Sequence, residues 1–282
     1  MKIDAHQHFW EYVKDEYSWI SDSMIGIRRD FLPVDFQKEL LDLGFDGSIA
    51  VQARQTVQET EWLLSLSEQN DFILGVVGWV DLRDRNVNEV LAAYSRHSKF
   101  VGLRHVVHDE VDDSFMLQKD FLRGLSYLSE LNLTYDFLLY PQHLPIAIEV
   151  ARMLPEQRFV VDHIAKPLIK EKQMEPWATN IKELARLSNV YCKLSGMVTE
   201  ANWEWWTPND FFPYLDVVID AFGTDRVMIG SDWPVCLLGG SYEEVMSIVY
   251  EYIDSFSKSE KAAILGSNCR NFYLGKKSAD ES

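Results

Sequence analysis

Two histidines near the start of the chain could carry chemistry. The stretch "KIDAHQHFW" at residues 2–10 places His6 and His8 one residue apart, at the end of an apolar run. Side chains alternate between the two faces of a strand, so a strand here would direct both imidazoles to one point. Such a pair could bind a metal ion or stabilise a developing oxyanion. The alternative is a pair of hydrogen-bonded core histidines, but their placement on one face favours a functional role.

Two further titratable residues follow apolar runs. Asp232 stands in "GSDWP", where a carboxylate is costly to bury unless it is used, and it could act as a general base. Its structural alternative is an N-cap for the segment that follows. His163 follows the run "VVD", and Asp162 and Lys166 flank it with charge, which again favours a functional role.

Apolar runs that could position these residues alternate with helical patterns along the chain. Several runs, such as "FILGVVGWV", are almost continuously apolar, which is typical of parallel strands buried on both faces. The predicted strands cover residues 2–6, 47–52, 72–80, 100–106, 134–139, 159–163, 190–194 and 227–230. Helical patterns lie between them; one opens at Thr56 with Glu59 three residues on, as in a capping box. This order predicts an α/β fold, a (β/α)8 TIM barrel that forms a single domain over residues 1–282.

A closed barrel would gather the candidate residues at the C-terminal ends of its strands, where barrel enzymes build their active sites. The eighth strand would lie beside the first, so Asp232 would become a neighbour of His6 and His8. Two long connections, residues 9–32 and 198–209, would lie at the same end. The second of them contains Trp203, Trp205 and Trp206. These tryptophans could stack on a sugar ring or pack over the mouth of the barrel.

The ordered set of motifs resembles one protein family over nearly the whole chain. It comprises the His-x-His after the first strand, "VGLRHVVHDE", "DHIAKP", "KLSGMVTE", "GSDWP" and "SNCRNFYLG". The set is similar to the amidohydrolase superfamily, in the branch that holds fuconolactone and rhamnonolactone hydrolases and the 2-pyrone-4,6-dicarboxylate hydrolases. The resemblance implies a hydrolase of carbohydrate metabolism that opens a lactone ester. It also implies that members of this branch can work without a metal.

The metal ligands that the superfamily usually adds are missing from the expected strands. The fourth strand offers Arg104 in place of a lysine, and the fifth offers no histidine. The remaining candidate ligands are His6, His8, His163 and Asp232. Three imidazoles and a carboxylate could hold zinc, although a nearby guanidinium would oppose it. We therefore expect either no required cofactor or one divalent metal such as zinc.

Lactone hydrolysis assigns a role to each of these groups. Asp232 would act as general base and return its proton to the leaving alkoxide, while His6, His8 and His163 would surround the carbonyl as oxyanion donors or metal ligands. The predicted substrate contacts are Arg104, Tyr140, Lys166, Gln52, Arg54, Trp79 and Trp205. For Arg104, an ion pair with a structural acid such as Asp81 is the alternative. Structural or surface roles are expected for His97, His105, His108 and His143.

Amino-acid composition limits the classes of partner that the protein could bind. The chain has 282 residues and a formal net charge of −17, which would repel nucleic acids and anionic membranes. Its three cysteines have neither metal spacing nor an even count, so we expect buried, reduced thiols. The N-terminal residues lack the pattern of a signal peptide, and no apolar stretch approaches the ~20 residues of a membrane helix. We expect a cytoplasmic protein whose partner is a small-molecule lactone, and we leave a homo-oligomer open.

Rival functions remain at this point. A pyrone dicarboxylate would require several converging arginines, whereas the strand ends offer only Arg104 and Arg54, so we favour a neutral aldonolactone such as L-fucono- or L-rhamnonolactone. A lactone derived from a pyrone or an aromatic compound stays the first alternative. A metal-dependent decarboxylase is the second. A barrel that binds a sugar acid without turnover is the non-enzymatic one.

Overall fold

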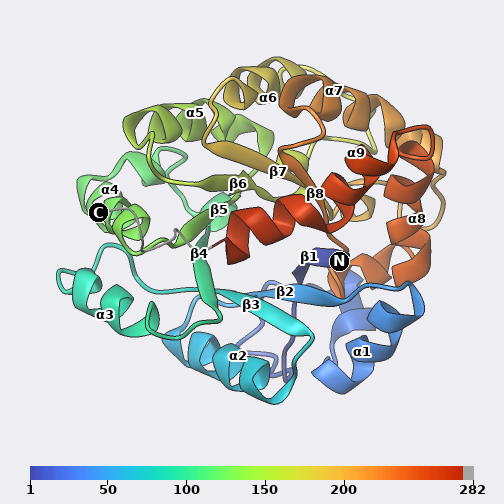
Figure 1. Ribbon diagram of the computed structural model, residues 1–282. Coiled ribbons are helices and arrows are strands. Elements are labelled where there is room, and N and C mark those ends of the chain that lie inside the picture. Colours follow the sequence, from blue (N-terminus) through green and yellow to red (C-terminus); the bar gives the residue numbers. More distant parts are fainter. Residues whose placement is uncertain (276–282) are drawn as a thin grey trace.

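The computed structural model describes residues 1–275, and in this range eight parallel strands form one sheet in the order β1 to β8. The strands are β1 (Ile3–Gln7), β2 (Gly47–Val51), β3 (Ile73–Gly78), β4 (Phe100–Val106), β5 (Thr134–Leu138), β6 (Phe159–Val161), β7 (Val190–Leu194) and β8 (Val227–Ile229). Figure 1 shows the helices in a ring around them. The (β/α)8 barrel predicted from the sequence is confirmed.

The surrounding helices follow the strands in chain order. They are α1 (Pro33–Asp42), α2 (Val57–Gln69), α3 (Val87–Tyr94), α4 (Lys119–Glu130), α5 (Leu144–Met153), α6 (Trp177–Ala185), α7 (Phe212–Phe222), α8 (Tyr242–Tyr252) and α9 (Lys258–Ala262). Among residues 1–275, no helix has both the length and the apolar character needed to cross a membrane. The single domain predicted for residues 1–282 stays a prediction, and it includes residues 276–282, which lie outside the described residues.

The barrel closes through the residues that follow β8 rather than through β8 itself. The backbone N–H of His8 donates to the carbonyl of Trp233 at 2.7 Å, and that of Asp232 donates to the carbonyl of His6 at 2.8 Å. β8 ends at Ile229, one residue earlier than predicted, so the seam beside β1 depends on these bonds. They place Asp232 next to both histidines, as the barrel hypothesis requires.

The predicted capping box at the start of α2 is half formed. The Thr56 hydroxyl accepts a hydrogen bond from the backbone N–H of Glu59 at 3.2 Å. The Glu59 carboxylate turns away from Thr56 and accepts the N–H groups of Ala53 and Arg54, at 3.0 and 2.8 Å. The Tyr17 hydroxyl donates to its other oxygen at 3.4 Å. Glu59 therefore ties the connection after β1 to the connection after β2.

Replacing Glu59 by glutamine is expected to stabilise the protein increasingly as pH rises from 5 to 8. Burial raises the pKa of Glu59 from 4.5 to about 7, so between these values the folded state holds a proton that the unfolded state has lost, and stability falls as pH rises. A glutamine oxygen could still accept both N–H groups, while its amide donates to Tyr17. Urea titrations should show the variant gaining roughly 2–3 kcal/mol relative to wild type between pH 5 and 8.

The matched control is Glu61→Gln, two residues along the same helix, where the side chain bonds the Tyr94 hydroxyl at the surface. Its stability difference from wild type should stay constant over the same pH range. A constant difference for Glu59→Gln as well would contradict the buried, protonated carboxyl.

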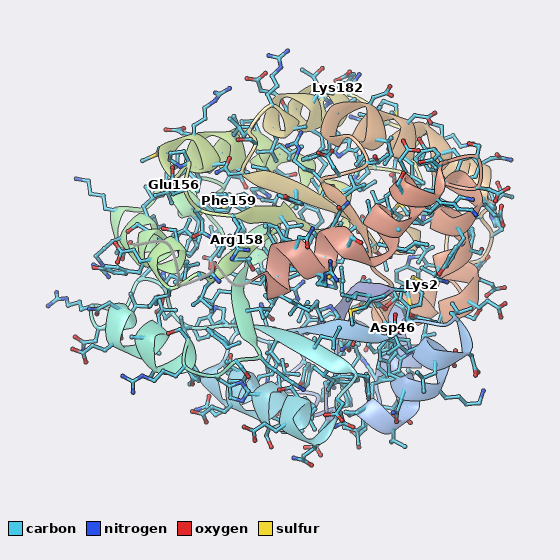
Figure 2. All side chains as sticks on the ribbon, viewed as in Figure 1. Lys2, Asp46, Glu156, Arg158, Phe159 and Lys182 are labelled. Carbon is cyan, nitrogen blue, oxygen red and sulfur yellow. The ribbon has the colours of Figure 1, made fainter. Side chains whose placement is uncertain are left out.

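The C-terminal segment covers the N-terminal end of the barrel. In Figure 1 the red segment, residues 258–274, crosses the barrel end that faces the viewer. Phe272 and Tyr273 pack against the inner barrel residues, and the Tyr273 hydroxyl donates to Asp136 on β5 at 2.7 Å. Arg158, labelled beside this segment in Figure 2, bonds the carbonyl of Phe272. This end of the barrel is closed, so the opposite end carries the cavity described below.

Candidate active site

Four side chains from three strand ends meet at the C-terminal end of the barrel. His6 Nε2 lies 3.1 Å from His8 Nε2, and His8 Nε2 lies 3.2 Å from Asp232 Oδ1. The Nε2 atoms of His6 and His163 are each 3.8 Å from the same carboxylate oxygen. All four residues are buried. The structure therefore brings together the whole set proposed as catalytic residues or metal ligands.

An unusual backbone turn directs His163 and Lys166 to this end of the barrel. β6 stops at Val161, two residues before the predicted end, because four consecutive residues from His163 to Lys166 have left-handed φ values between 48° and 61°. A left-handed conformation costs roughly 1–2 kcal/mol for each non-glycine residue, and such strain clusters at functional sites.

A glycine makes room for the His163 ring. Gly196 has a φ of +59°, and a Cβ atom there would lie 2.3 Å from His163 Nδ1. The same ring nitrogen is 2.9 Å from the Ser195 hydroxyl oxygen. The segment after β7 thus fixes the orientation of an imidazole supplied by β6.

A buried charge network supports His6 from inside the barrel. Lys193 Nζ donates to Asp136 at 2.6 Å and lies 3.0 Å from Asp162 Oδ1 and 3.1 Å from His6 Nδ1. The Arg104 guanidinium binds the other Asp162 oxygen at 3.1 Å and the carbonyl of Gln52. Two cations and two carboxylates therefore balance one another beneath the imidazoles.

This buried environment sets the protonation states of His6, His163 and Asp162. Burial lowers the pKa of His6 and of His163 well below 6.5, so both imidazoles are neutral near pH 7. Burial alone would raise the pKa of Asp162, but Lys193, His6 and Arg104 hold it well below 3.8, so this carboxyl is ionised.

The donor set at Asp232 fits a divalent metal. His8 Nδ1 lies 2.7 Å from the carbonyl of Val51 and must donate its proton there, so Nε2 is the ring nitrogen left to bind a metal. His8 Nε2 faces a carboxylate oxygen of Asp232 and the Nε2 atom of His6, an arrangement that a cation stabilises. His6, His8 and Asp232 are also the nitrogen and oxygen ligands that zinc accepts. Arg104 Nη1, 3.2 Å from His6 Nε2, competes for the same nitrogen.

A cavity of about 370 Å³ opens above these residues. It is lined by His8, Trp19, Met24, Ala53, Arg104, Val106, His108, Asp109, Leu138, Tyr140, His163, Lys166, Thr199, Glu200, Trp203, Asp232 and Val235. The lining combines apolar surface with polar groups from several strand ends, as small-molecule sites do.

Three of the seven predicted substrate contacts, Arg104, Tyr140 and Lys166, line this cavity. The other four do not. The amide of Gln52 donates to the carbonyl of Arg104, and Arg54 pairs with Glu16. The Trp79 indole donates to His105 at 3.2 Å. Trp205 is 66% exposed.

Several cavity residues had not been selected from the sequence. His108 had been assigned a structural or surface role, yet it lines the cavity and stacks on Tyr140 with 4.6 Å between ring centroids. Glu200 lines it too and stands in the quoted motif "KLSGMVTE". Of the three tryptophans that could stack on a sugar ring, Trp203 lines the cavity, although Trp205 was the predicted contact. The suggested pairing of Arg104 with Asp81 is wrong, because Arg104 binds Asp162. Asp81 binds Arg83, its close neighbour in the chain.

Comparison with known proteins identifies the family. The family model described as amidohydrolase matches residues 3–274, which is nearly the whole chain. The chain belongs to the amidohydrolase family. The resemblance noted from the ordered motifs is thereby confirmed.

Two curated relatives and one solved structure in the amidohydrolase family are similar in sequence to this chain over nearly their full length. An L-fucono-1,5-lactonase from Burkholderia multivorans is 38% identical over 291 residues, which cover 99% of this chain and 98% of the relative. One from Burkholderia ambifaria is 34% identical, covering 96% and 95%. A crystal structure of a B. multivorans amidohydrolase with bound zinc superposes with a TM-score of 0.94 at 39% identity, over 97% of this chain and 99% of that one.

Proposed function

We propose that this amidohydrolase hydrolyses the ring ester of a sugar-acid lactone, such as L-fucono-1,5-lactone. The observation that carries the proposal is the Asp232 carboxylate, which lies among His6, His8 and His163 at the base of the cavity. The two L-fucono-1,5-lactonases that match almost the whole chain support the same reaction.

The charges around the cavity favour a neutral lactone over a dicarboxylate. The cations that line it are paired, Arg104 with Asp162 at 3.1 Å and Lys166 with Glu200 at 2.9 Å. Asp232 adds negative charge to the same lining. A substrate with two carboxylates would meet repulsion here without an unpaired guanidinium to bind it. A polyol lactone with a neutral ring carries no such penalty.

Asp232 acts as the base in the proposed reaction. Its carboxylate accepts a proton from water as the water oxygen bonds to the lactone carbonyl carbon. The carbonyl oxygen becomes an oxyanion next to His163 and Arg104, whose N–H groups can donate to it. The bond to the ring oxygen then breaks, and Asp232 returns the proton to that oxygen. The product is an open-chain hydroxy acid.

We also propose that His6, His8 and Asp232 hold one divalent cation such as zinc. When bound, it would supply Lewis acidity and favour the ionised form of water.

We further propose a cytoplasmic location and a small-molecule substrate, as the sequence predicts. Buried free thiols at Cys192, Cys236 and Cys269 suit a reducing compartment.

A pH-indicator assay with a panel of aldonolactones tests this function, because hydrolysis releases a proton. We expect turnover of at least one six-carbon or deoxy-six-carbon aldono-1,5-lactone, and none of a pyrone dicarboxylate. Parallel reactions with a chelator, and with zinc added back, measure the need for metal. If no lactone in a broad panel is opened, the proposed function is wrong, and saturable binding without turnover would favour a sugar-acid-binding barrel.

A further inference from the structure

The Lys166–Glu200 ion pair lies in the wall of the cavity rather than in the core. Lys166 Nζ is 2.9 Å from Glu200 Oε1, and the two side chains are 15% and 18% exposed. The Thr199 hydroxyl donates to the same Glu200 oxygen at 3.4 Å. Among residues 1–275, the hydrogen bonds to the Glu200 carboxylate all end on Oε1, so Oε2 is free to accept a further hydrogen bond.

His108 adds a second polar group to the same wall. Its ring stacks on Tyr140, and Lys166 Nζ lies 6.0 Å from the centroid of that tyrosine ring. His108 Nδ1 is buried and has no hydrogen-bond partner among the described residues. Burial, followed by the charges of Lys166 and Arg104, lowers the pKa of His108 to about 3, so the imidazole is neutral. A buried ring nitrogen without a partner is costly unless a ligand bonds it.

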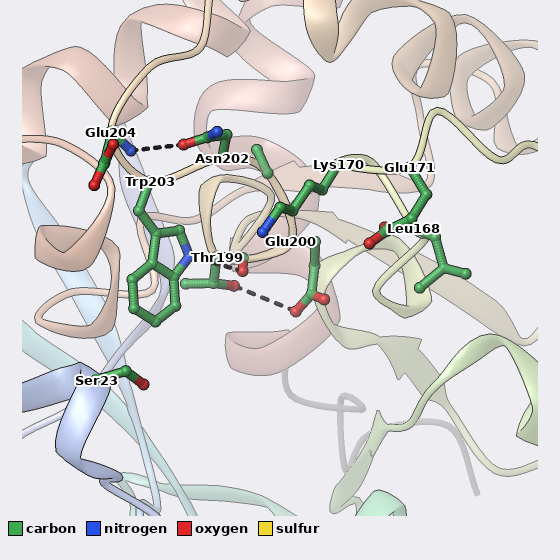
Figure 3. Close-up of a pocket in the computed structure, with 10 residues that line it drawn as sticks. Ser23, Leu168, Lys170, Glu171, Thr199, Glu200, Asn202, Trp203 and Glu204 are labelled. Carbon is green, nitrogen blue, oxygen red and sulfur yellow. Dashed lines mark hydrogen bonds between the residues drawn. The ribbon is translucent and has the colours of Figure 1, made fainter.

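The cavity wall continues into an aromatic face. Figure 3 shows the Thr199 hydroxyl directed at Glu200, with the Trp203 indole beside it. Thr199, Glu200 and Trp203 line both the cavity above Asp232 and a second hollow of about 620 Å³. A flat ring next to charged hydrogen-bonding groups suits a sugar ring, which presents C–H faces and hydroxyl edges.

We propose that Glu200, Lys166 and His108 form the subsite that recognises the hydroxyl groups of the lactone. The inference rests on the proposed function and assigns its specificity to named residues. A hydroxyl donates to the Glu200 carboxylate and accepts from the Lys166 ammonium or bonds the His108 nitrogen, so a diol edge matches the whole group. A lactone without hydroxyls cannot bond Glu200 Oε2 or satisfy His108 Nδ1 and is rejected.

The test compares two lactones with the same ring, a six-carbon aldono-1,5-lactone and unsubstituted δ-valerolactone, in Glu200→Gln and wild type. The substitution keeps the shape and removes the charged acceptor. We expect kcat/KM for the aldonolactone, divided by kcat/KM for δ-valerolactone, to fall about 10–100-fold. Glu200→Gln also leaves Lys166 without its partner, so activity on a lactone that carries a free carboxylate should rise relative to wild type.

The matched control is Glu204→Gln, on the same loop as Glu200. Among the cavities described for residues 1–275, Glu204 lines only the second hollow. Its ratio should equal that of wild type. Thermal melting confirms folding, and Glu200→Asp, which withdraws the carboxylate by one methylene, replaces Glu200→Gln if that variant does not fold. An unchanged ratio in a folded Glu200 variant overturns the inference while the proposed function stands. If wild type opens no lactone in the broad panel, the proposed function fails and the inference falls with it.

Discussion

Asp232→Asn is expected to lower kcat for the preferred lactone by roughly 10²–10⁴-fold, the range that a positioned general base contributes. Asparagine has almost the same shape and can still contact His8, whose Nε2 lies 3.2 Å from Asp232 Oδ1 in wild type. It cannot accept a proton from water. The measurement is initial velocity at saturating lactone in the pH-indicator assay, with thermal melting to verify the fold.

Asp113→Asn is the matched control, because Asp113 is an exposed carboxylate that bonds His143 rather than the histidines around Asp232. It should keep the wild-type rate. A near-wild-type kcat for Asp232→Asn would remove this residue from the role of base and leave the imidazoles, or a bound metal, to activate water.

Lys193→Met is expected to lower the free energy of unfolding by about 3–5 kcal/mol, the usual cost of leaving buried charges without a partner. Lys193 is fully buried, and its ammonium group contacts both Asp136 and Asp162. Methionine fills similar space without charge, so two carboxylates would face each other inside the barrel. Urea denaturation at pH 7 measures the loss.

Lys172→Met, at a lysine that is 77% exposed, controls for the loss of positive charge and should change stability by less than about 0.5 kcal/mol. Adding Asp136→Asn to Lys193→Met should restore part of the lost stability, because it removes one of the uncompensated charges. A loss below ~1 kcal/mol for Lys193→Met would contradict the network as a balanced set of charges.

The fold and the centre of the site could be predicted from the sequence, because both depend on regular features. The alternation of apolar strands with helical patterns defined the barrel, and closure of a barrel necessarily places the residues after β8 beside β1. His6, His8 and Asp232 therefore came together in the hypothesis as they do in the structure. The ends of β2, β3, β5, β6 and β8 were predicted one or two residues too late. At β6 and β8 the chain leaves the sheet early and presents functional residues.

The walls of the cavity could not be predicted, because loop geometry decides which side chain enters. The tryptophan expected to contact substrate, Trp205, is exposed, whereas Trp203, two residues away, lines the cavity. Nothing in the pattern of a loop distinguishes these two positions. The hydrogen bond between Asp136 and Tyr273 could not be predicted from the sequence either, because it depends on how the C-terminal segment packs into the barrel.

The seam between β1 and β8 has a consequence for the order of folding. His8 and Asp232 are 224 residues apart in sequence and meet only across this seam. A ribosome delivers the N-terminal residues first, so the nascent chain holds both histidines well before it holds their aspartate. Such distant contacts form late, because the entropy of closing a long loop must be overcome first. Recovery of turnover during refolding should therefore report closure of the barrel itself, after the earlier strands have already paired.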